Sequence, residues 1–329
     1  MGGRREPTMN PSGTPKDAEP NAKGPQVAPE WATFPTSLDW HVWMPCNLAC
    51  RFCFKTLPGF LSAKPVGSPL ALNRAEARRI LEILKCSGIE KITYAGGEPT
   101  LHPFLHELLE WSHDLGMTVM VVTNGHLFTE GYVLRIAPFL DAVKISIDSA
   151  DEATQKALGR GGGDHVARAL EAARLVKQHE VPLMLNTVVT ALNWNEDMTP
   201  LVSQLAPVRW KVFQALPEKG ENDRFRDWAS DEQFRRFLET NARGNPVSEP
   251  NDLMRGSYIM MDPLGRLMQD SPGHYVYSVP VQEVGFIRAL AQVGWDSERF
   301  VRRGGLYGWR HLRDVSARDN SDRGRPHDL

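Results

Sequence analysis

Residues 38–54 read LDWHVWMPCNLACRFCF, a stretch that joins a predicted strand to three closely spaced cysteines. The strand covers its first six residues, and Cys46, Cys50 and Cys53 follow in a Cys-x3-Cys-x2-Cys pattern. A secreted disulfide framework spreads its cysteines along the chain to close loops, whereas clustering of this kind is typical of a metal site. The pattern therefore predicts a metal centre directly after the first strand.

Strand-like runs alternate with amphipathic helical runs on the C-terminal side of this motif. Asn73 is predicted to cap the first helix, in which Ala77, Ile80, Leu81 and Leu84 share one face. Further strands are predicted at KITYAGG (91–97), TVMVVTNG (118–125), DAVKISIDS (141–149), VPLMLNTVV (181–189) and VRWKVFQ (208–214). Such alternation implies right-handed crossovers and a parallel sheet. The predicted fold class is α/β, an open, partial (βα)6 barrel with functional groups at the carboxyl ends of its strands.

The 329 residues divide into four predicted segments. Residues 1–35 are rich in Pro and Gly and are predicted to form a disordered tail, because they bury too little apolar surface to fold. The barrel is assigned to residues 36–215. Residues 216–310 break the strand–helix rhythm and are predicted to form a mixed extension that covers the barrel and closes its site. Residues 311–329 mix charges without periodicity and are predicted to form a second flexible tail.

The composition restricts the classes of partner. The net charge is −2, which does not favour a protein that coats nucleic acid, although it permits a local basic pocket. The sequence contains no run of about 18 apolar residues, and its first ten residues, MGGRREPTMN, lack the apolar core of a signal peptide. We therefore expect a soluble, cytoplasmic protein with neither a membrane nor a nucleic-acid partner.

The spacing of the cysteines favours an iron–sulfur cluster. Three thiolates can bind three irons of a 4Fe–4S cube and leave the fourth iron without a protein ligand. An open iron can bind a substrate, whereas fully ligated clusters usually transfer electrons. A zinc site completed by a histidine is the alternative, but the paired cysteine or histidine partners expected for zinc are missing.

Charged side chains are predicted inside the barrel, since residues two apart on a strand share one face. Val143, Ile145 and Ile147 suit the side that faces the helices. The inward side then carries Lys91, Lys144, Ser146, Asp148, Asn186, Arg209 and Lys211. Burying unpaired cations costs on the order of several kcal/mol each, so converging basic groups indicate an anion such as a polyphosphate. For Lys91 and Lys144, the alternative is a solvated strand end.

The cysteine pattern, together with Gly96-Gly97-Glu98-Pro99 after the second strand, resembles the radical S-adenosylmethionine (SAM) superfamily. The resemblance implies that the three cysteines hold a 4Fe–4S cluster whose open iron binds the amino and carboxylate groups of SAM. One electron from the cluster then cleaves SAM to methionine and a 5′-deoxyadenosyl radical. The glycines permit close backbone approach to the SAM amino group, which Glu98 would help to fix.

A narrower resemblance extends from Leu38 to Trp309. The segments CNLACRFCF, PVRWKVFQ, KGEN, SYIMMD and FVRRGGLYGW are similar to the viperin family of radical SAM nucleotide dehydratases. The resemblance implies a lyase that removes the ribose 4′ hydrogen and the 3′ hydroxyl of a ribonucleoside triphosphate, with CTP expected first and UTP or GTP as alternatives. The 3′-deoxy-3′,4′-didehydro product would terminate viral polymerase chains in antiviral defence. An electron donor such as flavodoxin or ferredoxin is implied as well.

The same resemblance assigns roles to individual residues. The SAM side is matched by Phe52, Gly96, Gly97, Glu98, Thr123, Asn124, Ser146 and Arg160, of which Ser146 and Arg160 match residues that hold the SAM carboxylate. The triphosphate side is matched by Lys91, Asn186, Arg209, Lys211 and Arg303. Tyr258 matches a tyrosine proposed to supply the hydrogen atom that quenches the product radical. Animal members carry lysines where this chain has Met184 and Tyr275, so the phosphate site is expected to hold less positive charge here.

Two other classes of function stay open on the sequence. A radical SAM enzyme that modifies a peptide or another small molecule is the first, but many such enzymes carry extra cysteines for auxiliary clusters. Only Cys86 is left over here, at the end of an apolar helical pattern where we expect a buried thiol. A redox-sensing iron–sulfur protein is the second, but a sensor gives no reason for the GGEP loop, Arg160 and an inward basic set.

Overall fold

The computed structural model describes residues 34–305 and Gly308. The predictions for residues 1–33 and 311–329 lie outside this range. Phe34, near the end of the predicted N-terminal tail, already packs against the core, with its ring centroid 6.0 Å from that of Phe286.

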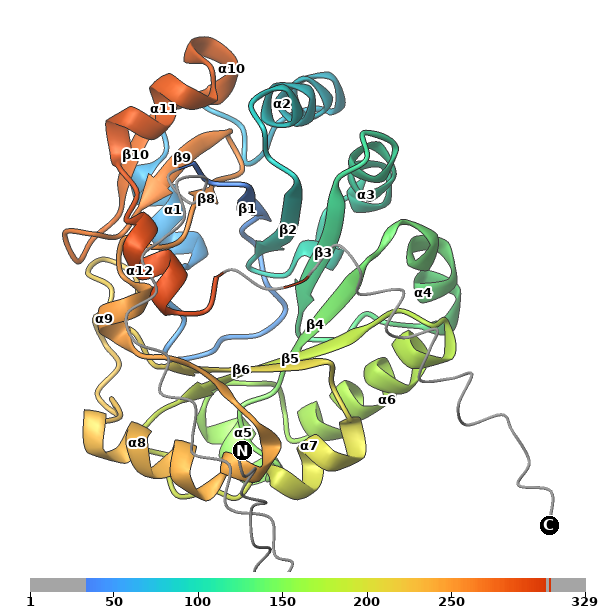
Figure 1. Ribbon diagram of the computed structural model, residues 1–329, viewed down its shortest axis with the longest axis vertical. Helices are drawn as coiled ribbons and strands as arrows, with labels where there is room; N and C mark the ends of the chain where they lie inside the picture. Colours follow the sequence, from blue (N-terminus) through green and yellow to red (C-terminus); the bar gives the residue numbers. More distant parts are fainter. Residues whose placement is uncertain (1–33, 306–307, 309–329) are drawn as a thin grey trace, which may run out of the picture.

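One curved sheet organises the described part of the chain (Figure 1). Its central strands are β1 (Ser37–Trp43), β2 (Lys91–Gly96), β3 (Thr118–Thr123), β4 (Ala142–Ser146), β5 (Leu183–Val189) and β6 (Arg209–Gln214). Each of these strands is parallel to the next in chain order, as right-handed strand–helix–strand units require. The sheet is strongly curved but does not close, which confirms the predicted partial barrel.

Helices cover the outer face of the sheet (Figure 1). The outer layer contains α2 (Arg74–Cys86), α3 (Leu105–Asp114), α4 (Glu130–Ile136), α6 (His165–Gln178), α7 (Thr199–Leu205) and α8 (Asp231–Thr240). Asn73 caps α2 as predicted, and its side chain exchanges hydrogen bonds with Glu76 in a capping box. The prediction of a buried thiol at Cys86 was wrong, because this thiol is exposed. As the last residue of α2, it lies off the stripe of buried side chains that ends at Leu84.

The C-terminal extension adds strands to both edges of the sheet instead of only covering the barrel. On one edge, β7 (Val247–Glu249) runs parallel to β6. On the other, β8 (Met260–Met261) pairs with β1, and β9 (Arg266–Gln269) and β10 (Val276–Pro280) follow in antiparallel order. Four short helices complete the extension: α9 (Asn251–Met254), α10 (Val281–Val284), α11 (Phe286–Val293) and α12 (Ser297–Arg302).

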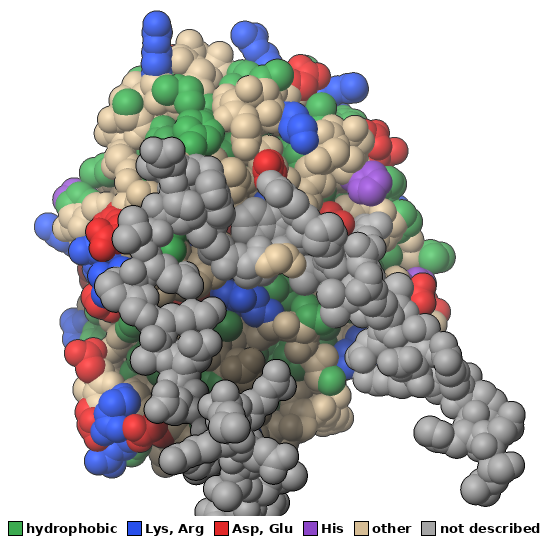
Figure 2. Space-filling model, viewed as in Figure 1, with side chains coloured by type: hydrophobic (Ala, Val, Ile, Leu, Met, Phe, Trp, Pro, Cys, Tyr) green, Lys and Arg blue, Asp and Glu red, His purple; other side chains and the backbone are tan. Residues whose placement is uncertain are grey.

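The two faces of the sheet differ in chemistry, as strand alternation predicts. Val143, Ile145 and Ile147 pack into the main hydrophobic core between sheet and helices. On the surface that Figure 2 shows, Lys and Arg side chains and Asp and Glu side chains lie interspersed. Among the residues described, the helices include none that is long and apolar enough to cross a membrane.

Candidate active site

A cavity of about 1010 Å³ occupies the inside of the barrel. Its lining brings together most of the residues singled out in the sequence: Cys46, Cys50, Phe52, Cys53, Gly96, Gly97, Thr123, Asn124, Ser146, Arg160, Asn186, Lys211 and Tyr258. A second cavity, of about 30 Å³, shares Asp39, Lys144, Lys211 and Tyr258 with the first and also contacts Lys91 and Arg303. The two cavities together form one elongated site with chemically different ends.

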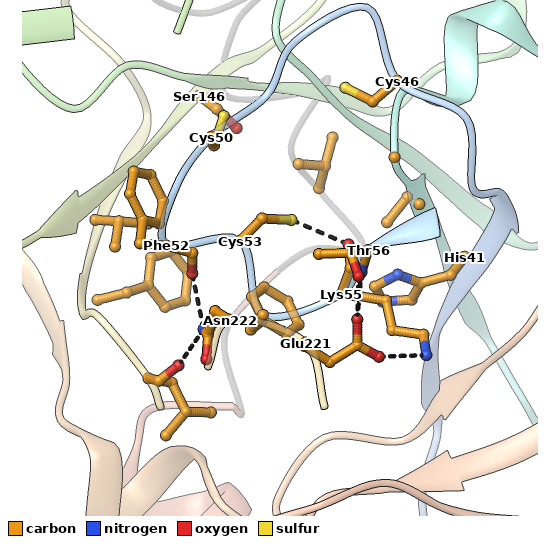
Figure 3. Close-up of a pocket in the computed structure, with 18 of the residues that line it drawn as sticks. His41, Cys46, Cys50, Phe52, Cys53, Lys55, Thr56, Ser146, Glu221 and Asn222 are labelled. Carbon is orange, nitrogen blue, oxygen red and sulfur yellow. Dashed lines mark hydrogen bonds and ion pairs between the residues drawn. The ribbon is translucent and has the colours of Figure 1, made fainter. Parts of the chain in front are cut away.

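The cysteine loop lies between β1 and α1 (Leu57–Ala63), and its three thiols surround part of the large cavity (Figure 3). Backbone hydrogen bonds fix its first half, from Ala49 N to the Gly159 carbonyl at 3.2 Å and from Arg51 N to the Leu158 carbonyl at 2.9 Å. Gly159 has a φ of +84°, and a side chain there would collide with the Ala49 carbonyl. The glycine therefore permits the close approach that anchors the loop.

The thiols fit a cluster better than a single ion. Among the described side chains, no group of three or more His, Cys, Asp or Glu is placed to hold one metal ion. A 4Fe–4S cube offers each thiolate a separate iron, so three thiols placed around one cavity suit it. Burial raises the pKa of Cys46 to about 11 and that of Cys53 to about 12. These thiols therefore need the positive charge of a bound metal to become ligands.

The GGEP loop packs directly against the cysteine loop. Gly97 N donates to the Trp43 carbonyl at 2.7 Å, and Glu98 N donates to the Pro45 carbonyl at 3.1 Å. A Cβ atom on Gly96 would collide with the Trp43 carbonyl, and one on Gly97 would collide with that of Met44. Both glycines are therefore required by the contact between the two loops.

Glu98 lies behind the cavity lining rather than in it. Its buried carboxylate accepts hydrogen bonds from the Thr100 amide and hydroxyl, from the Thr123 hydroxyl at 2.8 Å and from the Asn124 amide at 2.9 Å. Burial raises its pKa, and these hydrogen bonds oppose the rise. In this structure Glu98 positions Thr123 and Asn124, which do line the cavity.

Arg160 supplies a fixed positive charge beside the thiols. Its guanidinium forms a buried ion pair with Asp148 and lies 5.6 Å from the centroid of the Phe52 ring. Burial opposes its charge, but Asp148 and Cys50 raise its pKa overall. Ser146 lies at the carboxyl end of β4, where its carbonyl is 2.9 Å from Nε2 of His165. Together, a guanidinium and a nearby hydroxyl can bind a carboxylate.

The other end of the site is basic, and its cations lie on the strands of the barrel. Lys91 is the first residue of β2, and Lys144 and Lys211 lie within β4 and β6, so these cations occupy strand faces and not the carboxyl-end loops. Burial lowers the pKa of Lys211 to about 8 and lowers the pKa values of Lys144 and, strongly, Lys91. Neither lysine lies at a solvated strand end, because Lys91 is 5% exposed and Lys144 is 7% exposed.

Two carboxylates at this end escaped the sequence analysis. Glu249, buried at the end of β7, forms ion pairs with Lys211 and with Arg303 at 3.5 Å and accepts a hydrogen bond from the Tyr258 hydroxyl. Burial opposes its charge, yet the two cations hold its pKa below the ordinary value. Asp39 behaves in the same way: burial would raise its pKa, but the surrounding lysines lower it.

A signal for Asp39 was present in the sequence, and one for Glu249 was not. Asp39 alternates with Leu38 and Trp40 on the first predicted strand, which places it on the inward face. Glu249 lies on a strand of only three residues, too short for a readable alternation.

Tyr258 lies where both cavities meet. Lys211 Nζ is 3.0 Å from its hydroxyl, and the Arg303 guanidinium lies 3.6 Å from its ring centroid. Burial raises the pKa of Tyr258 well above its ordinary value, so the phenol stays protonated at neutral pH. Asn186, on β5, has a buried side-chain oxygen without a hydrogen-bond partner among the described residues. An unsatisfied buried oxygen at a cavity wall suits a ligand that donates a hydrogen bond.

Three residues lie apart from the cavity lining. Arg209 is half-buried and donates to the Gly304 carbonyl at 2.9 Å. Met184 packs with Met120 and Ala142 in a small apolar cluster. The ring of Tyr275 lies 4.5 Å from the ammonium of Lys55. None of the three lines either cavity, but Arg209 lies close enough to the basic end for its charge to lower the pKa of Lys144.

Comparison with known proteins places this site in a family. A family model for the radical SAM superfamily matches residues 45–200. An S-adenosylmethionine-dependent nucleotide dehydratase of Flammeovirga pacifica is 36% identical over 83% of this chain and 96% of that protein. One of Lacinutrix mariniflava is 38% identical over 83% of this chain, which spans 58% of that relative's length. The enzyme of the same name, RSAD2, from Siniperca chuatsi is 37% identical over 84% of this chain and 80% of that protein.

Solved structures share the fold. The enzyme anSMEcpe with bound AdoMet superposes with a TM-score of 0.58 at 18% identity, covering 78% of this chain and 77% of that chain. Streptococcus suis SuiB bound to S-adenosylmethionine gives a TM-score of 0.56 at 20% identity, covering 71% and 60%. Identities this low show the fold alone.

The superfamily match and the relatives make this chain an enzyme that uses a 4Fe–4S cluster and SAM. The zinc and redox-sensor alternatives are thereby set aside. The chain belongs to the radical SAM superfamily and, within it, to the family of S-adenosylmethionine-dependent nucleotide dehydratases.

Proposed function

We propose that this enzyme dehydrates a ribonucleoside triphosphate, CTP before UTP or GTP, to its 3′-deoxy-3′,4′-didehydro analogue. The observation that carries the proposal is the charge at the basic end of the site. Lys91, Lys144, Lys211 and Arg303 surround the small cavity, and Asp39 and Glu249 are the carboxylates that face them. This concentration of basic groups around one cavity favours a ligand with several negative charges.

The lysine pKa values support the same ligand. Burial is the largest cause of the lowered pKa values of Lys91, Lys144 and Lys211, and neighbouring cations lower them further. A triphosphate would oppose both effects, because its negative oxygens accept charge-assisted hydrogen bonds from the buried ammonium groups and offset the repulsion between them. Binding of the triphosphate would therefore relieve the repulsion between the cations that is present in the free protein.

The two ends of the site would have different roles, radical formation at the thiol end and triphosphate binding at the basic end. Cys46, Cys50 and Cys53 would hold the cluster, and Arg160 and Ser146 would orient the carboxylate of SAM. When bound, the cluster and SAM supply the radical that removes a ribose hydrogen atom. With the triphosphate at the basic end, the ribose would lie between the two ends, within reach of Asn186 and Tyr258, which line the large cavity.

Tyr258 is the residue proposed to complete the reaction. After the 3′ hydroxyl has left as water, its protonated phenol would give a hydrogen atom to the substrate radical, and Lys211 and Glu249 hold its hydroxyl. One electron from the external donor and one proton would then return the tyrosyl radical to the phenol. The product lacks a 3′ hydroxyl and would terminate a viral polymerase chain, which is the basis for the proposed role in antiviral defence. Flavodoxin or ferredoxin is the class of electron donor proposed, and the cytoplasm the proposed location.

A competition assay tests the proposal. Anaerobic enzyme would be given SAM, a reductant and all four ribonucleoside triphosphates at equal concentration, and the products would be read by mass spectrometry. A dehydrated cytidine nucleotide in excess supports CTP as substrate. A dehydrated uridine or guanosine nucleotide in excess corrects the base and keeps the reaction class. Four nucleotides recovered unchanged, with an intact cluster, would reject the proposal.

A further inference from the structure

The sequence KGEN (219–222) belongs to the extension, and its last two residues contact the cysteine loop. We propose that Glu221 and Asn222, which line the large cavity, are positioning residues for the cluster and hold Cys53 and its neighbours in place. This inference rests on the family assignment and is independent of which nucleotide the enzyme uses.

Asn222 holds the backbone on the N-terminal side of Cys53. Its amide nitrogen donates to the Phe52 carbonyl at 3.0 Å and to the Leu216 carbonyl at 2.9 Å (Figure 3). Its side-chain oxygen accepts from the Glu218 amide at 2.8 Å. Because Asn222 is buried and these partners come from two different segments, its side chain ties the cysteine loop to the extension in one orientation.

Glu221 holds the backbone on the C-terminal side of Cys53. One carboxylate oxygen accepts from the Thr56 amide at 2.6 Å and from the Thr56 hydroxyl at 2.7 Å, and the other pairs with Lys55 at 3.0 Å (Figure 3). The Cys53 thiol donates to the Lys55 carbonyl at 3.0 Å. Cys53 therefore lies between two anchored points, Phe52 and Lys55–Thr56.

The Lys55–Glu221 pair is almost completely buried, with side chains 1% and 4% exposed. The Lys55 ammonium also donates to the Tyr277 hydroxyl at 2.7 Å and lies 4.5 Å from the Tyr275 ring centroid. Desolvating such a pair costs about as much as its attraction returns, so it contributes little to global stability. What it does supply is a defined position for the cysteine loop against β10.

Gly59 shows how tightly the Glu221 carboxylate packs against the first turn of α1. It lies in α1, where Thr56 is the N-cap, and a Cβ atom on Gly59 would collide with the Glu221 carboxylate. Alanine normally favours a helix over glycine by about 1 kcal/mol. Here a glycine is required for Glu221 to reach the Thr56 amide, so Gly59→Ala should displace the carboxylate while leaving every charge in the chain.

The experiment compares Glu221→Ala and Asn222→Ala with Glu218→Ala. Glu218 is a matched control, since it is a buried carboxylate directly before the KGEN segment that pairs with Arg255 at 3.1 Å, and no hydrogen bond joins its side chain to the cysteine loop among the described residues. Each apo protein would be assayed by thermal unfolding and by proteolysis of residues 50–60. Each reconstituted protein would be assayed for the rate of iron loss to a chelator and for the electron paramagnetic resonance spectrum of the reduced cluster.

Glu221→Ala and Asn222→Ala should lose iron roughly 10-fold faster than Glu218→Ala, as variants of groups that orient metal ligands do. Their cluster spectra should differ from wild type, and the loop should be cleaved faster in the apo chain. Glu221→Gln keeps an acceptor for Thr56 and should recover part of the loss. Iron loss and spectra equal to those of Glu218→Ala would overturn the proposal.

Gly59→Ala covers the case in which the alanine variants fail to fold. It is expected to be less destabilised than Glu221→Ala, because the carboxylate is displaced and not removed, and still to lose iron faster than Glu218→Ala. Wild-type iron retention in Gly59→Ala would contradict the proposal, whatever the other variants do.

Discussion

The two ends of the site are built in different ways. The thiol end comes from one continuous loop, with the GGEP loop and the KGEN segment packed against it. The basic end comes from single residues on separate strands, β1, β2, β4, β6 and β7, and from Arg303 after α12. The first end is a local property of the sequence, whereas the second exists only once the sheet has formed. The predictions below separate the two ends by experiment.

Removing a cluster ligand should have the largest effect, because it eliminates the thiol end. Cys50→Ala is expected to abolish the brown absorbance of the reconstituted protein and all cleavage of SAM, since two thiolates hold the cube poorly. Absorbance spectra, iron content and 5′-deoxyadenosine measure this. Cys86→Ala, which removes an exposed thiol, is the control and should keep both properties. Full SAM cleavage in Cys50→Ala would refute the metal assignment.

Removing the Tyr258 hydroxyl should uncouple the two ends. Tyr258→Phe keeps the ring against Arg303 but loses the hydrogen that quenches the radical. Dehydrated product should fall by roughly 100-fold or more, if the lower limit for a positioned proton donor is taken as the scale for this hydrogen-atom donor. Formation of 5′-deoxyadenosine should fall much less, and the ratio of the two products measures the uncoupling. An unchanged ratio would remove Tyr258 from the chemistry and leave it as a packing residue.

Removing a cation from the basic end should weaken binding and spare the cluster. Lys211→Ala is expected to cost roughly 1.5–3 kcal/mol of nucleotide affinity through a lost charge-assisted hydrogen bond. Calorimetry with CTP measures the affinity, and iron content should match wild type. Lys219→Ala, an exposed lysine of the KGEN segment, is the control. Unchanged affinity in Lys211→Ala would exclude Lys211 from the phosphate site.

The pH dependence of binding should be the smallest effect. Burial lowers the pKa of Lys211 to about 8, so this lysine is charged below that pH and neutral above it. Nucleotide affinity should therefore fall as the pH rises from 7 to 9, by up to about 10-fold for one pKa unit. The stability of the nucleotide-free fold should change in the opposite direction, because the unfolded chain keeps its lysine proton to higher pH. A flat affinity profile would indicate that Lys211 is not the titrating group.

Much of the fold could be predicted from local patterns. The strand–helix order, the Asn73 cap and the inward lysines of β2, β4 and β6 follow from periodicity, and the structure confirms them. The prediction that the Cys86 thiol is buried was wrong, because the apolar stripe of α2 ends before the helix does. The strands of the extension were not predicted, since β8 has only two residues and its partner, β1, is more than 200 residues away.

The residues of the site also differ in whether a local sequence pattern predicts them. The cysteines and the GGEP loop are readable because each is contiguous and its spacing carries the chemistry. The carboxylates were harder, because Glu249 meets Lys211, Arg303 and Tyr258 only through strand pairing between β6 and β7 and the return of α12. Glu221 was visible only as part of a family segment, and its contact with Thr56 spans 165 residues.

The dependence of SAM cleavage on nucleotide tests the central claim most directly. Anaerobic, reconstituted enzyme would be incubated with SAM and reductant, with and without CTP, UTP or GTP, and 5′-deoxyadenosine would be quantified. We predict that one nucleotide accelerates its formation strongly and is consumed in a matching amount. The same slow rate with every nucleotide and with none would contradict the account, because the basic end would then have no part in the reaction at the thiol end.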